Sequence, residues 1–163
     1  MTSIRSQQPL KPSLLDRLID RNPGTPDPPG GYGTHMRDIQ DSVCRDLEQL
    51  LNTRWRCLDW PADLTELETS MVNYGIPDFT GANLGTQNLR EEFRRVIERT
   101  IKRFELRLQD VEVILPDKRE SLDRSLQFRI EATLPVDPVP QSVAFDSRLE
   151  PTTAMFQVSR TAR

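Results

Sequence analysis

The spacing of apolar residues changes once along this chain, near residue 108, from the helical period to strict alternation. Before that point apolar residues recur every three or four positions, and after it they recur at every second position. A chain that places its helices first and its strands afterwards is expected to fold as an α+β domain. The sequence therefore predicts N-terminal helices packed on a small antiparallel sheet that ends in a C-terminal β-hairpin.

Residues 86–104 carry the clearest helical pattern of the chain. Their apolar face consists of Leu89, Phe93, Val96, Ile97, Ile101 and Phe104. Glu91 stands four residues before Arg95, which is the spacing of a stabilising ion pair on a helix surface. Glu98 stands at the same distance before Lys102. This segment is predicted to be the helix that organises the fold.

Two further helices are predicted before it. One has an apolar stripe made of Ile39, Val43, Leu47, Leu50 and Leu51. The other spans residues 63–74, because Asp63 and Glu66 fit a D-x-x-E capping box at its start. Gly75 suits the left-handed position just past its end, and Pro77 prevents its continuation.

Alternating segments after residue 108 predict the strands. The inward positions are Val111, Val113 and Leu115, then Leu126, Phe128, Ile130, Ala132 and Leu134, then Val143, Phe145, Ser147 and Leu149, and finally Ala154, Phe156 and Val158. The last two sets are separated by a short polar turn and form a hairpin. Its outer strand presents unpaired backbone N–H and C=O groups unless something covers them.

The first third of the chain contains an isolated helix and a linker. Leu14, Leu15, Leu18 and Ile19 recur at helical spacing after Ser13, a natural N-cap. Residues 21–33 hold four prolines and four glycines and should form an extended linker. We therefore expect residues 1–33 to be a tethered helix and residues 34–163 to be the folded domain. Such a helix docks either on its own domain or on a partner.

Composition and charge argue against several classes of function. The chain has 22 Lys and Arg against 25 Asp and Glu, which gives no field that would attract nucleic acid or an anionic membrane. No apolar run approaches the roughly 20 residues of a membrane span, and residues 1–10 lack a signal core. We therefore expect a cytoplasmic protein without direct membrane insertion. The lone His35 and the distant Cys44 and Cys57 lack ligand spacing, so no metal or cofactor is expected.

Four phrases, in the same order, resemble the TssE family of type VI secretion baseplate components, which belongs with the wedge proteins of contractile phage baseplates. They are Leu-Leu-Asp-Arg-Leu at residues 14–18, Arg-Asp-Leu-Glu with Leu-Leu-Asn-Thr-Arg at 45–54, Ser-Met-Val-Asn-Tyr-Gly-Ile-Pro-Asp at 70–78 and Phe-Glu-Leu-Arg-Leu at 104–108. The later strands also look like that family. One departure is Leu106, which stands where the family usually has proline between Glu105 and Arg107.

The resemblance implies a structural protein that sits in the baseplate wedge with TssF, TssG and TssK. It also implies that the protein starts the sheath built of TssB and TssC. Residues expected at the wedge interface are Glu105 and Arg107, together with Leu14, Leu15 and Leu18 of the tethered helix. Residues 143–149 and 154–158 are expected to receive sheath strands by β-augmentation, through Val143, Phe145, Leu149, Ala154, Phe156 and Val158.

Alternatives exist for these roles. Glu105 and Arg107 could simply pair within the domain. A lysozyme-like glycoside hydrolase would need two carboxylates at a set separation, and no pattern singles out such a pair among the acidic residues at 59–68, so no enzymatic activity is expected. A wedge protein of a phage tail or of another contractile injection particle would share the fold but not the setting.

Overall fold

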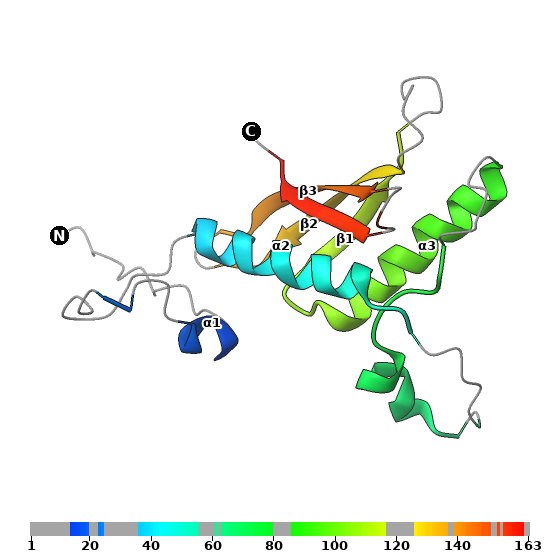
Figure 1. The fold of residues 1–163 in the computed structure, drawn as a ribbon, viewed down its shortest axis with the longest axis horizontal. Coiled ribbons are helices and arrows are strands. Elements are labelled where there is room, and N and C mark those ends of the chain that lie inside the picture. Colours follow the sequence, from blue (N-terminus) through cyan, green and yellow to red (C-terminus); the bar gives the residue numbers. More distant parts are fainter. Residues whose placement is uncertain are drawn as a thin grey trace.

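The computed structural model describes residues 14–19, 23–24, 36–55, 61, 63–79, 86–116, 126–136, 139–150, 153 and 155–161, and Figure 1 shows their arrangement. The helices are α1 (Leu14–Leu18), α2 (Met36–Asn52) and α3 (Gln87–Phe104), with two short 3-10 helices, η1 (Thr65–Thr69) and η2 (Met71–Asn73). The strands are β1 (Gln109–Ile114), β2 (Gln127–Leu134), β3 (Gln141–Glu150) and β4 (Met155–Arg160). These helices precede these strands, as the change of period predicts.

The strands form one antiparallel sheet in the order β1-β2-β3-β4, so β1 and β4 are its two edges. The long helices α2 and α3 pack on the sheet, with α2 alongside β4 and α3 against β1 (Figure 1). The pairing of β1 with β2 shifts register between Gln109 and Glu112, whereas β3 and β4 keep one register throughout. The α+β fold with a C-terminal hairpin is confirmed.

The core lies between the two long helices and the sheet. It is built from residues at the predicted apolar positions, including Val43, Leu47, Leu50 and Leu51 of α2, Phe93, Ile97 and Ile101 of α3, and Val113, Ile130, Val143 and Phe145 of the strands. Phe128 lies between Phe93 and Phe156, with edge-to-face ring contacts at centroid distances of 5.5 and 5.8 Å. This row of rings joins α3, β2 and β4 through favourable aromatic contacts.

The prediction of one α-helix at residues 63–74 is wrong. The chain forms the two 3-10 segments η1 and η2 there, and the residue that caps η1 is Leu64, whose side chain makes no capping hydrogen bond. The capping box of Asp63 and Glu66 is therefore not the start of an α-helix. Because η1 contains no buried residue, the segment lacks the apolar packing that stabilises short helices in proteins.

The predicted helix at residues 86–104 is confirmed by α3, but its ion pairs differ. Arg94 binds both Glu91, at 3.0 Å, and Glu98, at 2.9 Å, in place of the expected pairs with Arg95 and Lys102. The helix ends at Phe104, and the Leu106 side chain is 81% exposed. The absence of the family's proline therefore does not extend α3.

Candidate interaction surfaces

The hairpin residues predicted to meet the sheath lie mostly in the core. Val143, Phe145, Phe156 and Val158 are buried against the helices, and Leu149 packs partly buried against the same core. Ala154 lies outside the described residues. These side chains hold the hairpin in place, so what the hairpin can offer a partner is its main chain.

The outer edge of β4 is covered by side chains of α2. The Phe156 amide donates to Asn52 Oδ1 at 2.7 Å, and the Phe156 carbonyl accepts from Asn52 Nδ2 at 2.8 Å. At the next outward position, the Val158 amide donates to Glu48 Oε2 at 3.0 Å, and the Val158 carbonyl accepts from Cys44 Sγ at 3.1 Å. The sequence predicts an outer strand with unpaired backbone groups unless something covers them. In the structure, side chains of α2 occupy two successive outward positions of this strand.

The opposite edge, β1, is covered in part by α3. The Val113 amide donates to Glu98 Oε1 at 3.0 Å, and the Arg90 guanidinium donates to the Pro116 carbonyl just after the strand. The register shift in β1 is a bulge, which increases local twist and disfavours pairing with a further strand.

Glu105 and Arg107 bind each other. Arg107 Nε and Nη2 each lie 2.7 Å from an oxygen of the Glu105 carboxylate, which makes a bidentate pair. Arg107 also donates to Asp46 and, at 3.0 Å, to the hydroxyl of Ser42. The Glu105 side chain is buried, and its hydrogen bond raises the pKa of the Arg107 guanidinium further above its usual range.

This polar network continues into the N-terminal helix. The Ser42 hydroxyl donates to Asp16 Oδ2 at 2.6 Å, and Arg45 binds Asp16 Oδ1 at 2.7 Å. Asp16 belongs to α1, so the helix docks on its own domain through a polar contact. We call Asp16, Ser42, Arg45, Asp46, Glu105 and Arg107 the polar network.

The docking of α1 leaves apolar side chains on the surface. Leu15 is 52% exposed and Leu18 is 82% exposed, while the side chain of Leu14 lies outside the described residues. Ile19, just after the helix, is also exposed. The sequence pattern identified these leucines, but it gave no signal for the anchoring role of Asp16.

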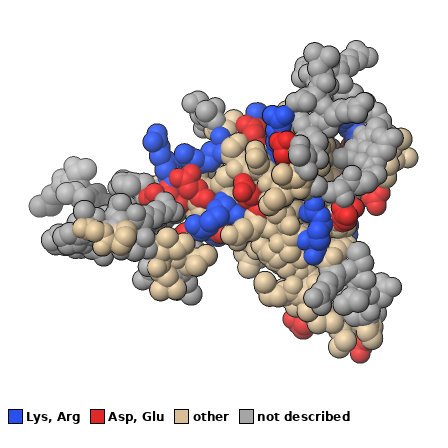
Figure 2. All heavy atoms as spheres, viewed as in Figure 1, with Lys and Arg blue, Asp and Glu red and all other residues tan. Residues whose placement is uncertain are grey.

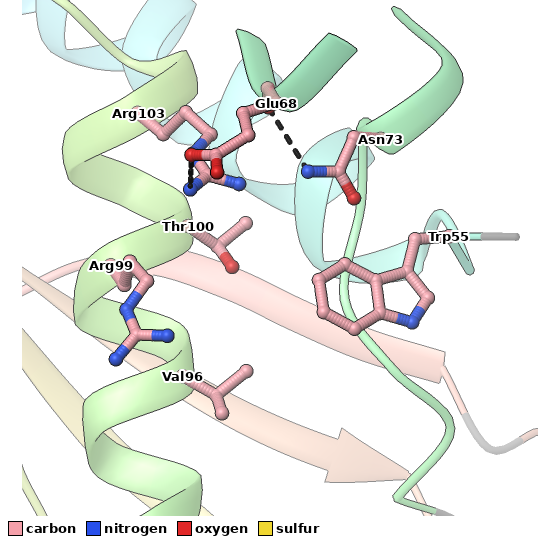
Figure 3. A pocket seen from close by; sticks show the side chains of 7 residues that line it. All are labelled: Trp55, Glu68, Asn73, Val96, Arg99, Thr100 and Arg103. Carbon is pink, nitrogen blue, oxygen red and sulfur yellow. Dashed lines mark hydrogen bonds and ion pairs between the residues drawn. The ribbon is translucent and has the colours of Figure 1, made fainter. Parts of the chain in front are cut away.

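A small hollow lies between α3 and the η1–η2 segment, and Figure 3 shows its walls. Its volume is about 180 Å³, and it is lined by Trp55, Glu68, Asn73, Val96, Arg99, Thr100 and Arg103. Glu68 is the one carboxylate among these lining residues, and it pairs with Arg103 at 3.1 Å. The hollow therefore does not present the pair of carboxylates that glycoside hydrolysis needs.

Among the described residues on the face drawn in Figure 2, charges of both signs are interspersed, with no broad area of one sign. Among the described residues, no group of three or more His, Cys, Asp or Glu side chains is arranged to hold a metal ion. None of the described helices has both the length and the apolar character of a membrane span.

Comparison with known proteins gave one match. A family model described as Baseplate wedge protein gp25 matches residues 37–139, which is more than half of the chain. No curated protein and no solved structure matched. The matched region contains most of α2, the whole of α3, β1 and β2, and it ends before the β3–β4 hairpin begins.

Proposed function

Since the chain belongs to the gp25-like family of baseplate wedge proteins, we propose that it is a structural subunit of a type VI secretion baseplate. In this role it joins the wedge with TssF, TssG and TssK, in the cytoplasm at the inner face of the membrane. It also gives the first ring of TssB and TssC sheath subunits a β-sheet to extend. The family is one of structural baseplate proteins, and the proposed task is accordingly assembly.

The regular C-terminal hairpin carries the sheath part of the proposal. β3 and β4 pair in one unbroken register, and β4 is an edge strand of the sheet. Strand addition uses backbone groups, which are alike in every sequence, so a single subunit of a different kind can start a repeating polymer. The buried Phe156 and Val158 fix the position and the twist of the strand that would be extended.

A proline at the end of β4 tests this part. The amide of Arg160 points away from β3, because outward amides recur at every second residue and Val158 is one of them. Arg160→Pro removes that donor without removing core volume, whereas the control Arg160→Ala keeps the donor and loses the same ion pair with Asp41. In cells lacking the native gene, we expect Arg160→Pro to yield few or short sheaths and Arg160→Ala to yield many. Full-length sheaths in normal number with Arg160→Pro would contradict strand addition at this edge.

The exposed leucines of α1 support the wedge part of the proposal. Leu15 and Leu18 form an apolar surface on a helix that the polar network anchors to the domain. Exposed apolar side chains on an anchored helix are suited to dock in an apolar groove of a partner. Glu105 and Arg107, which bind each other and Asp46, would then act by holding this surface in place.

Substitutions at exposed leucines test whether the α1 surface contacts TssF and TssG directly. Replacing Leu15 and Leu18 together by Asp should abolish recovery of TssF and TssG in a pull-down with little change in thermal stability, because both side chains are exposed. Leu89→Asp, at an exposed leucine of α3, is the matched control and should leave recovery unchanged. Equal recovery with both variants would reject the α1 surface.

Glu105→Ala tests the supporting role. It leaves a half-buried Arg107 without its bidentate partner and should lower the free energy of unfolding by about 2 kcal/mol, the range for hydrogen bonds to charged groups. Recovery of TssF and TssG should fall as well. Undiminished recovery would reject a role of Glu105 in wedge assembly.

The second candidate is a baseplate wedge protein of a phage tail or of another contractile injection particle. The family match favours it equally, because the match describes the wedge protein and not the machine. Genes for a ClpV-like unfoldase and for a membrane complex beside this gene would support the type VI assignment. Capsid and tail-fibre genes there would overturn it.

A further inference from the structure

The side chain of Asn52 binds the edge of β4 as a neighbouring strand would. Its carboxamide accepts a hydrogen bond from the Phe156 amide and donates one to the Phe156 carbonyl, at 2.7 and 2.8 Å. In an antiparallel sheet, the two members of a hydrogen-bonded residue pair exchange this same pair of bonds. Asn52 therefore occupies the place of one residue of an added strand.

Cys44 and Glu48 repeat this arrangement at Val158. Cys44, Glu48 and Asn52 follow each other at intervals of four residues, so they form one stripe along α2. Four residues of helix advance by about 6 Å, and two residues of strand advance by about 6.7 Å. Because these distances nearly match, one stripe of a helix can serve successive outward positions of a strand. We call these three side chains the edge clamp.

We infer that the outer edge of β4 is the edge that accepts a partner strand, and that the edge clamp occupies it until that strand replaces it. The partner is an extended polypeptide segment that donates to the carbonyls and accepts from the amides of Phe156 and Val158. This inference rests on the proposed role in strand addition. It identifies which edge of the sheet accepts the partner strand. It also identifies the edge clamp as the group of side chains that competes with that strand in the free protein.

The exchange is feasible because α2 itself need not leave the sheet. Its apolar residues Val43, Leu47 and Leu51 are fully buried and hold the helix in the core. Cys44, Glu48 and Asn52 are less buried and can turn towards solvent while the helix stays in place. Each hydrogen bond that the edge clamp gives up is replaced by one from the incoming strand, so the number of bonds is conserved.

The β1 edge is a poorer acceptor. Its bulge places a residue with positive φ, Asp110, within the strand, which interrupts the regular spacing of the outward groups. β4 has six residues paired in one register and outward groups that are already aligned for hydrogen bonding at Phe156 and Val158.

Amide hydrogen exchange in the free protein tests the edge clamp itself. Asn52→Ala should speed exchange of the Phe156 amide at least tenfold, measured by NMR, because its acceptor is lost. The Gln157 amide faces β3 and should keep its protection. Gln49→Ala removes an exposed amide from the same helix and should change neither rate. An unchanged Phe156 rate in Asn52→Ala would overturn the inference.

Binding of the purified TssB–TssC sheath complex tests the competition. We expect Asn52→Ala to bind about tenfold more tightly than the unsubstituted protein, because the incoming strand no longer displaces two hydrogen bonds. Gln49→Ala should bind as the unsubstituted protein does. Asn52→Asp keeps the acceptor for the Phe156 amide and loses the donor, so it should lie between them, and it serves as the comparison if Asn52→Ala does not fold.

The outcomes separate this inference from the proposed function. Equal or weaker binding by the Asn52 variants, with binding by the unsubstituted protein intact, overturns the edge clamp and leaves the sheath role standing. Failure of every protein to bind the sheath complex overturns the sheath role and the inference with it.

Discussion

At the scale of single residues, two buried serines differ in what their hydroxyl groups contact. Ser42 donates to Asp16 and accepts from Arg107, so its burial is compensated. Ser147 faces the core from β3 at 2% exposure, and its hydroxyl oxygen has no hydrogen-bond partner among the described residues. An unpaired buried hydroxyl costs free energy that a methyl group would not.

Ser147→Ala should therefore stabilise the protein. We expect the free energy of unfolding to rise by about 1 kcal/mol, measured by urea denaturation. Ser42→Ala is the matched control and should lower it, because Asp16 and Arg107 would each lose a partner. A loss of stability in Ser147→Ala would show that its hydroxyl is paired in solution.

The surroundings of the Cys44 thiol stabilise its protonated form. Burial, followed by the negative charges of Glu48 and Asp41, raises its pKa from 9.0 to about 11. The folded state binds the proton of the Cys44 thiol more tightly than the unfolded state does. The contribution of this thiol to the free energy of unfolding is therefore fully present below pH 9. It is lost as the pH rises from 9 towards 11.

Comparison with Cys44→Ser isolates this effect. The serine hydroxyl does not titrate in this range, so the stability of the unsubstituted protein relative to Cys44→Ser should fall between pH 9 and pH 11. Chemical denaturation at several pH values measures the difference. A difference that stays constant over this interval would show that the thiol has an ordinary pKa in the folded protein.

At the scale of elements, the turn after η2 depends on Gly75. Gly75 has φ of +111°, and a Cβ atom there would lie 2.4 Å from the backbone oxygen of Thr53. The same oxygen accepts a hydrogen bond from the Ile76 amide at 2.9 Å, and Ile76 is fully buried. The glycine therefore lets the chain approach the end of α2 closely enough to place Ile76 in the core.

Gly75→Ala should cost about 3 kcal/mol of stability, because it combines a disfavoured φ with a clash against backbone. Gly24→Ala is the control, since nothing lies within 4 Å of a Cβ at that position. Thermal unfolding of the two variants checks this prediction. Similar melting temperatures would mean that the turn rearranges without cost.

The elements that the sequence predicted are those whose apolar residues repeat with a clear period. α2, α3 and the inward faces of the strands follow this rule, because each buries most of one apolar face. Residues 63–74 were predicted wrongly since local capping residues were present without a buried face. These elements can be predicted because the apolar pattern that determines each of them lies within a single segment of the chain.

The candidate site was less predictable because it depends on contacts between distant residues. Asn52 meets Phe156 from 104 positions away, and Arg107 meets Asp46 from 61 positions away. The hairpin, its edge strand and the exposed leucines could be predicted. The edge clamp has a visible i, i+4 spacing, but only the fold shows that this stripe lies beside β4.

At the scale of the whole molecule, α2 contacts both proposed interfaces. Ser42 and Asp46 lie on one side of the helix and belong to the polar network that anchors α1. Glu48 and Asn52 lie on another side and cover the edge of β4. Between these sides, the apolar stripe of α2 is fixed in the core. The wedge surface and the sheath surface are thus held by one rigid helix, which suits a protein that sets the position of a sheath on a baseplate.

Hydrogen exchange measured by mass spectrometry on the baseplate, with and without bound TssB and TssC, tests the central claim most directly. Peptides that cover β4 should gain further protection when the sheath is present, because main-chain hydrogen bonds to a partner strand then replace the side-chain hydrogen bonds of the edge clamp, which open more readily. Peptides from β2, which is already paired on both sides, serve as the internal reference. Strong sheath binding with unchanged exchange in β4 would contradict the account.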